Sequence, residues 1–596
     1  MSARKPNVKR RRPGSFLSPN PPVFETGFPE ILPALPFFKG RRAFFGFVER
    51  FHLDRKGKKI QNFIMDFASL VAALQTPEIY PEKPAKVDLV QTHISAVFLA
   101  GEHVYKVKKP VNLGFLDFTT LEKRKFYCQE EVDLNRRLAG DVYLGVVEVR
   151  SHQGRISIEG GPGEVIEYAV KMKRLPPDCQ MDQLLAKGAI PPEMVKKIAA
   201  KLAQFHARAA TNPEIASFGE IQMVRGNVEE NFAQTEKYVG EVFTPGLYRE
   251  TIEATRLFME RQSLLFDKRV RQGKIRDCHG DLHLQHICLG KEIIIFDCIE
   301  FNRRFRYSDV AADIAFLLMD LDDHRHPLLS ADLASHYLRI TADWPLYLLL
   351  DFYKSYRAYV RAKVISLRRD APDISPREKA SAVEEARRYY SLSHFYAHRM
   401  NRPILVITGG LIGTGKSTIA GSLAEALGWE WLRVDLLRKE LAQVSPREHR
   451  FEAFEQGIYS PDFSRRTYEA LFNRAGILLG QGKTALLDGS FKKQADRKAA
   501  LALARETGAD FLLIECQCAD EEIQKRMARR ALEKNELSDG RWEILADQKK
   551  DYDRVEGFNA DLHLPLDTGR PLEECVGIIL RHLLQKAGRE LSAAWH

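Results

Sequence analysis

Residues 404–427 read ILVITGGLIGTGKSTIAGSLAEAL, and this stretch decides the fold of the C-terminal part of the chain. A short apolar run typical of a buried strand precedes a glycine-rich loop, and a helix with apolar periodicity follows it. The loop from Gly410 to Ser417 has the spacing GxxxxGK[ST]. Its glycines allow backbone N–H groups to turn inward around a phosphate, and the helix N-terminus adds its dipole. The order strand–loop–helix therefore predicts a phosphate-binding loop.

Each residue type in this loop suits one part of a nucleoside triphosphate. The ammonium group of Lys416 is a point charge for the β- and γ-phosphates, and the Ser417 hydroxyl is a magnesium ligand. ATP and Mg²⁺ are therefore the expected cofactors. The candidate nucleotide-binding residues are Gly410, Gly413, Thr414, Gly415, Lys416, Ser417 and Thr418.

Acidic and basic residues further along the chain fit the same chemistry. Asp488 ends a second apolar strand and suits the magnesium ion, while Asp435 is predicted to end the strand 431–435. At the carboxyl edge of the sheet, Asp435 is placed to act as a general base on an acceptor hydroxyl. The helix 521–530 carries Arg526, Arg529 and Arg530 on one side, where Arg526 and Arg530 are the candidates to meet the transferring phosphoryl group. A solvated basic face is the alternative for these arginines.

The segment 402–584 resembles the small P-loop kinases of the shikimate, gluconate and polynucleotide 5′-hydroxyl kinase type. The resemblance rests on the phosphate loop, on the D-x-x-R-K run at 435–439, on DGSF at 488–491 and on SDG at 538–540. It implies an AAA-type ATP-binding domain in which Asp435 contacts the acceptor.

A second group of residues lies in the N-terminal half. The run CHGDLHLQHI at 278–287 contains Asp281, and Asp297 follows sixteen residues later at a strand end. Asp281 is suited to orient or deprotonate a hydroxyl, and Asp297 to hold magnesium against phosphates. Upstream, Lys106 lies on a predicted strand and is expected to pair with Glu131 on the next helix, which would position α- and β-phosphates.

These residues resemble the aminoglycoside phosphotransferase and choline kinase superfamily over about 87–367, which implies a protein-kinase-like bilobal domain with a connector at 165–176. The family usually has Asn five residues after the catalytic Asp, but this chain has His286. Asn suits a hard cation, whereas imidazole suits softer metals. His286 is therefore either a metal ligand beside Asp297 or a buried structural residue. No GxGxxG motif lies near the first hairpin, so 92–95 would have to serve as the phosphate-covering loop.

Charge and composition bound the remaining interpretations. The net charge is +10, and all of it falls in 1–64, where 14 basic and 4 acidic residues stand; the remainder has 76 of each. We interpret 1–64 as a basic, disordered leader, with Met65 as a possible start. The zero balance of 65–596 argues against nucleic acid as a partner. No apolar run reaches the length of a membrane span. The eight scattered cysteines, without CxxC spacing, fit a reducing cytoplasm, and we interpret Cys278, Cys288 and Cys298 as buried small residues beside strand-like runs.

The sequence thus predicts an α/β and α+β multidomain protein: a leader at 1–64, a kinase-like domain at 65–400 and a P-loop kinase domain with a parallel sheet at 401–596. Together the two halves resemble bacterial proteins that fuse an aminoglycoside phosphotransferase-like domain to a small P-loop kinase. The leading hypothesis is an ATP-dependent phosphotransferase with two nucleotide sites, acting on a small hydroxyl- or amine-bearing acceptor. The alternatives are an ATP-binding regulatory protein with an N-terminal pseudokinase and a nucleic-acid 5′-hydroxyl kinase. The sequence indicates no protein partner.

Overall fold

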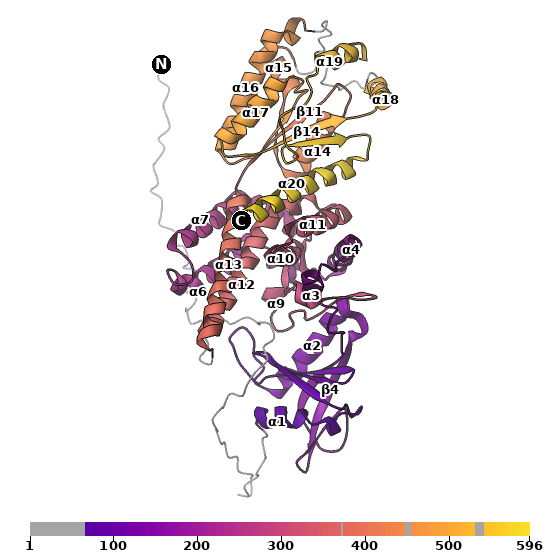
Figure 1. The fold of residues 1–596 in the computed structure, drawn as a ribbon, viewed down its shortest axis with the longest axis vertical. Coiled ribbons are helices and arrows are strands. Elements are labelled where there is room, and N and C mark those ends of the chain that lie inside the picture. Colours follow the sequence, from indigo (N-terminus) through magenta and orange to yellow (C-terminus); the bar gives the residue numbers. More distant parts are fainter. Residues whose placement is uncertain (1–65, 371–373, 446–447, 449–454, 531–541, 596) are drawn as a thin grey trace, which may run out of the picture.

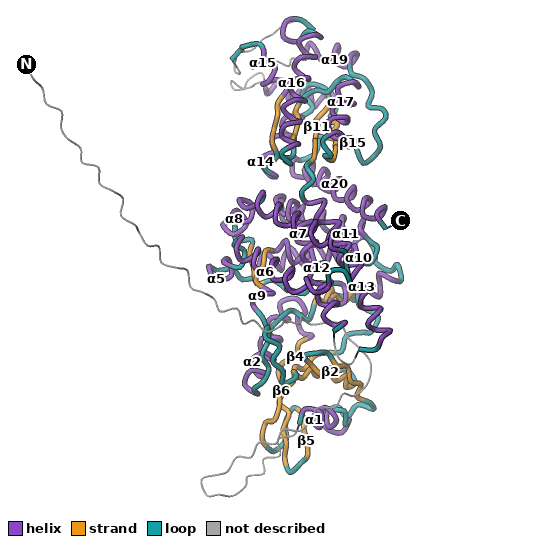
Figure 2. Tube along the Cα trace, turned by 90° about the vertical axis from the view of Figure 1, so that its left-hand side faces the viewer, coloured by secondary structure: helices purple, strands orange, loops and turns teal. Residues whose placement is uncertain are grey.

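The structure is a computed structural model that describes residues 66–370, 374–445, 448, 455–530 and 542–595. The leader at 1–64 and the motif at 538–540 lie outside these residues. Three units are stacked along the long axis (Figure 1), and strands gather at the two ends with helices between them (Figure 2). The mixed α/β fold with a parallel C-terminal sheet is confirmed.

The first unit is a six-stranded antiparallel sheet in the order β1-β2-β3-β6-β4-β5, against which helix α2 packs. Its elements are α1 (Phe67–Leu74), β1 (Val87–Gln91), β2 (Ser95–Ala100), β3 (His103–Lys108), α2 (Leu121–Ala139), β4 (Tyr143–His152), β5 (Arg155–Ile158) and β6 (Glu164–Lys173).

The alternating pattern at 89–108 predicts one hairpin with its turn at 101–102. That turn is present between β2 and β3, but a second tight turn at 92–95 divides the first arm of the hairpin into β1 and β2. Thr92 closes that turn: its N–H donates to Ser95 O at 2.9 Å, and its hydroxyl accepts from Ser95 N at 2.9 Å. The expected connector at 165–176 begins with a predicted strand at 165–173, and β6 confirms this strand by running to Lys173; only the residues after it leave the sheet.

The central unit is helical, with four short strands. It contains α3 (Met181–Ala186), α4 (Pro192–Arg208), α5 (Pro213–Ser217), α6 (Ile221–Thr235), α7 (Pro245–Arg261), α8 (Ser263–Arg271), β7 (Ile275–Asp277), β8 (Ile287–Leu289), β9 (Ile293–Ile295), α9 (Arg303–Arg306), β10 (Tyr307–Asp309), α10 (Val310–Asp323), α11 (Pro327–Thr341), α12 (Leu350–Arg369) and α13 (Pro376–Met400). Every residue of α10 is buried, so this helix forms the axis of the unit.

The third unit is a five-stranded parallel sheet in the order β12-β13-β11-β14-β15. Its elements are β11 (Ile404–Gly409), α14 (Lys416–Leu427), β12 (Glu430–Arg433), α15 (Val434–Leu441), α16 (Pro461–Gly480), β13 (Ala485–Asp488), α17 (Gln494–Glu506), β14 (Asp510–Gln517), α18 (Asp520–Arg530), α19 (Leu545–Asp551), β15 (His563–Asp567) and α20 (Leu572–Ala594). The predicted strand 431–435 is too long, because β12 ends at Arg433 and Asp435 lies in the first turn of α15.

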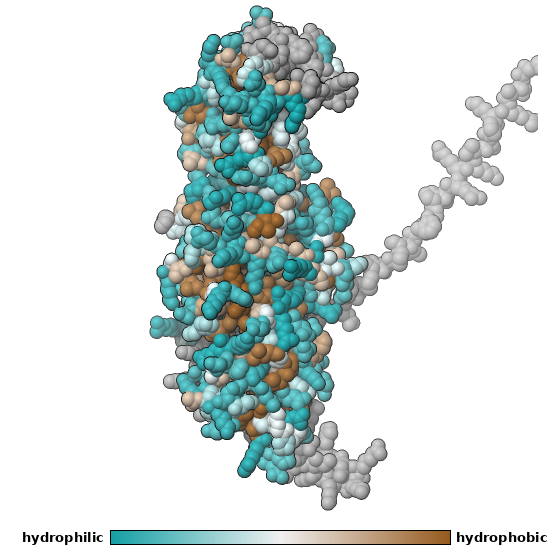
Figure 3. All heavy atoms as spheres, turned by 90° about the vertical axis from the view of Figure 1, so that its right-hand side faces the viewer, coloured by the Kyte–Doolittle hydropathy of each residue, from teal (hydrophilic) through white to brown (hydrophobic). Residues whose placement is uncertain are grey.

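One hydrophobic core runs from the helical unit into the parallel sheet. It contains Leu338 of α11, Ile579 of α20 and Val406 of β11. Helix α20 lies across the top of the helical unit and packs along α11 (Figure 1). On the face seen in Figure 3, hydrophobic side chains form only small patches on a mainly hydrophilic surface. None of the helices in the described part of the chain combines the length and hydropathy that a bilayer crossing requires.

The contact between α20 and α11 generates a stability prediction. A Cβ atom on Gly588 would lie 3.0 Å from the backbone oxygen of Pro327, at the start of α11. We expect Gly588→Ala to lower the free energy of unfolding by about 1–3 kcal/mol, because the methyl group would push α20 off a rigid backbone atom. Urea unfolding of the full chain measures this change.

Gly577→Ala is the matched control on the same helix. There the nearest atom to a new Cβ is the Arg339 side-chain Cδ at 3.6 Å, an ordinary contact. Alanine should therefore stabilise α20 through its helix propensity, by up to about 1 kcal/mol. Equal stability of the two variants would contradict the close packing at Gly588.

Candidate functional sites

The glycines of the phosphate loop stand where the backbone needs them. Gly410, Gly413 and Gly415 all have positive φ angles, of 133°, 76° and 83°. A Cβ on Gly410 would also lie 2.4 Å from the backbone oxygen of Cys516, so no side chain fits there. Gly415 is the N-cap of α14, which starts at Lys416. The loop therefore wraps the N-terminus of a helix, as the sequence pattern predicts.

The polar residues of the loop converge on the sheet edge. Lys416 Nζ donates to Leu411 O at 2.6 Å, and the Thr414 hydroxyl donates to the same oxygen at 2.7 Å. Thr414 is buried, while Thr418 is exposed in the first turn of α14. The Ser417 hydroxyl bonds to Asp488, the last residue of β13.

Asp488 is the carboxylate of this site. Burial raises its pKa, while the bond from Ser417 and the charge of Lys416 act in the opposite direction. Asp435 lies close enough to Asp488 to raise its pKa further, and Arg433 lies 3.6 Å from it. A hydroxyl and a carboxylate are the oxygen donors that Mg²⁺ prefers, so Ser417 and Asp488 fit a magnesium ion.

Helix α18 covers the phosphate loop. Ile523 and Met527 pack over Gly413, and Arg526 Nη1 would lie 3.1 Å from a Cβ on Gly415. Arg526 is held in place by bonds to Thr568, of which the one to the backbone oxygen is 2.7 Å. The structure thus brings Arg526 to the loop. The side chain of Arg530 lies outside the described part of the chain.

A second site lies between the antiparallel sheet and the helical unit. A cavity of about 680 Å³ opens there. The sheet lines one side with Val97, Val104 and Lys106, and the 174–177 segment closes the back. Asp281, His286 and Asp297 line the opposite side. The cavity therefore brings together the candidate site residues of the N-terminal half, of which Lys106 and Asp297 are 191 residues apart in the sequence.

Buried ion pairs cross this cavity. Lys106 Nζ lies 2.8 Å from Glu131 Oε1 on α2 and 2.7 Å from Asp297 Oδ1. Burial disfavours the charged lysine, but Asp297 and Glu131 outweigh it and raise the pKa of Lys106 well above its ordinary value. Lys108, two residues along β3, pairs with Glu131 at 2.7 Å and also with Glu300. Glu131 thus serves both lysines.

The Asp281 loop forms the floor of the cavity. Burial opposes ionisation of Asp281, but the neighbouring His283 and His286 imidazoles hold its pKa well below the usual value. His283 Nε2 lies 3.5 Å from Asp281 Oδ2. His286 Nδ1 lies 2.9 Å from Asp281 O, which leaves Nε2 facing Asp297 Oδ2 at 3.5 Å.

The donor set near His286 differs from that at Ser417. An imidazole nitrogen bonded through its other nitrogen to a backbone carbonyl is a common metal ligand, and it favours softer cations than an amide oxygen does. Asp297 supplies the carboxylate that any divalent ion would use. The residues therefore fit a divalent cation, with less preference for Mg²⁺ than an Asn at position 286 would give.

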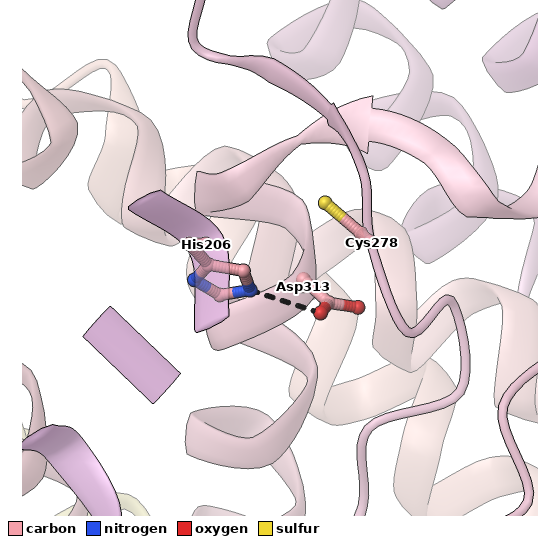
Figure 4. Close-up of side chains that lie close together, drawn as sticks. All are labelled: His206, Cys278 and Asp313. Carbon is pink, nitrogen blue, oxygen red and sulfur yellow. Dashed lines mark hydrogen bonds and ion pairs between the residues drawn. The ribbon is translucent and has the colours of Figure 1, made fainter. Parts of the chain in front are cut away.

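A buried brace holds the Asp281 loop on α10 (Figure 4). Asp313 accepts from the backbone N–H groups of His279 and Gly280 at 3.1 and 2.9 Å. His206 of α4 lies with Nε2 3.1 Å from Asp313 Oδ2, and Cys278 lies beside this pair (Figure 4). Burial opposes ionisation of Asp313, but the His206 hydrogen bond helps to hold its pKa below the usual value. Both carboxylate oxygens of Asp313 are occupied, so this cluster acts as a structural support.

A disulfide joins Cys179 and Cys288, with Cα atoms 4.8 Å apart. Cys288 is a buried small residue, as predicted, but its bond to Cys179 was not predicted, since the sequence suggests only free thiols. The two cysteines are 109 residues apart, and only the fold brings the segment after β6 against β8. Cys278 and Cys298 are buried thiols, as predicted.

The helices on the far side of the cavity contribute residues that the sequence does not predict. Arg304, Arg357, Arg361 and Lys363 line the cavity together with Asn231. Four basic residues within two helical segments are a weak signal in a sequence, because most basic helix faces are solvated. That they line one cavity is visible only once α6, α9 and α12 are packed.

The C-terminal unit is thus a P-loop domain, and a protein-family model described as an AAA domain matches residues 405–555. The chain is 30% identical over 492 residues to the "Uncharacterized protein Rv2004c" of Mycobacterium tuberculosis, covering 82% of this chain and 94% of that protein. The "Uncharacterized protein Mb2027c" of Mycobacterium bovis matches with the same figures. The chain belongs to the family of these mycobacterial proteins.

Solved structures similar to the C-terminal unit cover about a third of the chain. A sugar kinase from Janibacter sp. HTCC2649 is 20% identical, with a TM-score of 0.24, and covers 30% of this chain and 92% of its own. A gluconokinase from Sinorhizobium meliloti 1021 is 18% identical, with a TM-score of 0.23, over 32% of this chain and 96% of its own. The APS kinase CysC of Mycobacterium tuberculosis is 21% identical, with a TM-score of 0.23, over 30% of this chain and 98% of its own.

The brace under the Asp281 loop generates a second stability prediction. In Asp313→Asn, one side-chain oxygen becomes an NH₂ group that faces N–H donors, so buried bonds are lost. We expect the free energy of unfolding to fall by about 2–4 kcal/mol. Asp133→Asn, at an exposed position on α2, should change it by less than about 0.5 kcal/mol. Urea denaturation compares the two, and equal stability would rule out the brace.

Proposed function

We propose that the chain is an ATP-dependent phosphotransferase with two nucleotide sites, each acting on a small hydroxyl- or amine-bearing acceptor. In this proposal the third unit, within 401–596, is a small P-loop kinase domain. The first and central units, within 65–400, together form a kinase-like domain of the aminoglycoside phosphotransferase type. The observation that carries it is that each site sets a lysine against a carboxylate: Lys416 near Asp488, and Lys106 near Asp297.

At the C-terminal site, the loop N–H groups and Lys416 bind the phosphates. Mg²⁺, when bound at Ser417 and Asp488, supplies positive charge to the phosphate oxygens. Asp435, beside Asp488, removes the proton of the acceptor hydroxyl. Arg526, held over Gly415 by Thr568, stabilises the charge that develops on the transferring group.

At the N-terminal site, Lys106 binds the α- and β-phosphates while Glu131 holds the lysine in place. Asp281 orients the acceptor hydroxyl and takes its proton, and Asp297 with His286 holds the divalent cation. The 92–95 turn lies at the cavity, since Thr92 and Ile94 line it, and is placed to cover the phosphates.

A regulatory ATP-binding role for the N-terminal unit is the second candidate. The observation that favours it is His286, which stands where the resembled kinases have an asparagine. Under this candidate, the N-terminal cavity binds nucleotide without transferring a phosphoryl group.

The C-terminal site is tested with Lys416→Ala in the Asp281→Asn background, in which the N-terminal site is silent. We expect ATP turnover to fall by at least about a hundredfold, because the phosphates lose their point charge in a site that works by electrostatic stabilisation. Lys549→Ala, an exposed lysine paired with Asp520, is the control and should keep full turnover. If the Lys416→Ala variant turned over ATP as fast as its Asp281→Asn parent, the phosphate loop could not be the site of this activity.

The N-terminal site is tested with Asp281→Asn in the Lys416→Ala background. An enzyme should lose its remaining ATP-dependent transfer by about a hundredfold or more while it still binds ATP, since Lys106 and Asp297 are intact. Nucleotide binding by fluorescence and turnover by ADP release separate the two effects. ATP binding with no turnover in the Lys416→Ala parent itself would favour the regulatory candidate.

A further inference from the structure

The helical wall of the N-terminal cavity carries positive charge. Among the described residues of α6, α9 and α12 that line the cavity, four are basic and none is acidic. The basic residues are Arg304, Arg357, Arg361 and Lys363. This wall lies beyond Asp281 from the nucleotide-facing sheet, where an acceptor would sit.

The charge begins next to the candidate base. Arg357 Nη1 donates to Gly280 O at 3.1 Å, one residue before Asp281. Arg361, one turn later on α12, lies close enough for its charge to lower the pKa of Asp281. Arg361 Nε is buried and has no hydrogen-bond partner among the described residues.

The charge is least compensated at Lys363. Its ammonium group donates to two neutral amide oxygens, Asn231 Oδ1 at 2.6 Å and Gln234 Oε1 at 3.0 Å. Burial and the nearby Arg304 guanidinium lower the pKa of Lys363 to about 8, and Glu230, which pairs with Arg304, only partly offsets them. A bound anion would supply the missing opposite charge.

Asn231 adds a second orphaned donor at the same place. Its side chain is 5% exposed and lines the cavity, and its Nδ2 group has no hydrogen-bond partner among the described residues. Buried donors without partners are rare and costly, so each calls for an acceptor atom. Asn231 Nδ2 and Arg361 Nε are both donors, and a ligand rich in oxygen acceptors would satisfy them together with Lys363.

We infer that the N-terminal cavity takes an anionic acceptor: a small hydroxyl-bearing compound with a phosphate or carboxylate group. The hydroxyl would lie at Asp281 and the anionic group toward Lys363. Arg357 contacts the residue before Asp281, and Lys363 follows it by six residues, which is about 9 Å along the axis of α12. A polycation such as an aminoglycoside would meet like charges along this wall. The inference rests on the proposed transfer chemistry at Asp281 and adds the class of acceptor.

The test uses probes that share one carbon skeleton and differ in charge: glucose, glucosamine, gluconate and glucose 6-phosphate. Calorimetry is done on the full chain carrying Lys416→Ala, so that the P-loop does not contribute anion binding, with a non-hydrolysable ATP analogue present. We expect gluconate or glucose 6-phosphate to bind at least about tenfold more tightly than glucose, because charge-assisted hydrogen bonds form only with the anions.

Three variants locate the effect. Lys363→Met and Arg361→Gln should each weaken anion binding about tenfold or more. Lys237→Met should leave anion binding unchanged. Lys237 lies just after α6, is half-exposed and pairs with Asp370. If circular dichroism shows that Lys363→Met does not fold, anion binding by Arg361→Gln tests the inference instead.

Equal binding of glucose and its 6-phosphate, no binding of either anion, or anion binding unaffected in the folded variants would overturn the inference. The proposed function fails separately. ATP-dependent phosphorylation of glucose or glucosamine that is lost in Asp281→Asn would uphold the transfer chemistry and refute an anionic acceptor. Anion binding without any transfer would refute the transfer chemistry and leave the anion pocket in place.

Discussion

The N-terminal half depends on a buried network of ion pairs between the antiparallel sheet and the helical unit. Lys106 on β3 contacts both Glu131 on α2 and Asp297 beyond β9. Removing one partner would leave a buried charge without compensation, which costs several kcal/mol, so the network fixes how the two units face each other. Glu131 links the two lysines of β3, because one of its carboxylate oxygens pairs with Lys106 and the other with Lys108. In the proposed function, the Lys106 ammonium group of this network is the part that binds phosphates.

The C-terminal half shares a hydrophobic core with the helical unit. The core that fills the helical unit continues through α11 and α20 into the parallel sheet. Gly588 allows α20 to lie close to the start of α11. Arg399, near the end of α13, pairs with Asp351 of α12 at 3.2 Å and with Glu590 of α20. The two candidate nucleotide sites therefore lie on one continuous scaffold, although each is built from its own loops.

The two sites differ in how much the sequence predicts of them. The phosphate loop is local: Gly410 to Ser417 are consecutive, and their spacing specifies strand, turn and helix at once. The N-terminal site is assembled from Lys106, Glu131 and Asp297. The sequence predicts the pairing of Lys106 with Glu131, but neither the contact of Lys106 with Asp297 nor the pair between Lys108 and Glu131. The strand break at Thr92 and the early end of β12 were missed because single turn residues, rather than hydrophobic periodicity, decide them.

The sequence by itself determined the parallel C-terminal sheet, its phosphate loop and the candidate acids Asp281 and Asp297, because each is encoded in a short run with a fixed spacing. Only the tertiary structure decided the Cys179–Cys288 disulfide, the brace from His206 to Asp313 and the basic wall around Lys363. In all three cases the partners lie more than a hundred residues apart in the sequence and meet only through tertiary packing. Burial then gives these groups their properties, since an exposed lysine would carry an ordinary pKa and an exposed amide would bond to water.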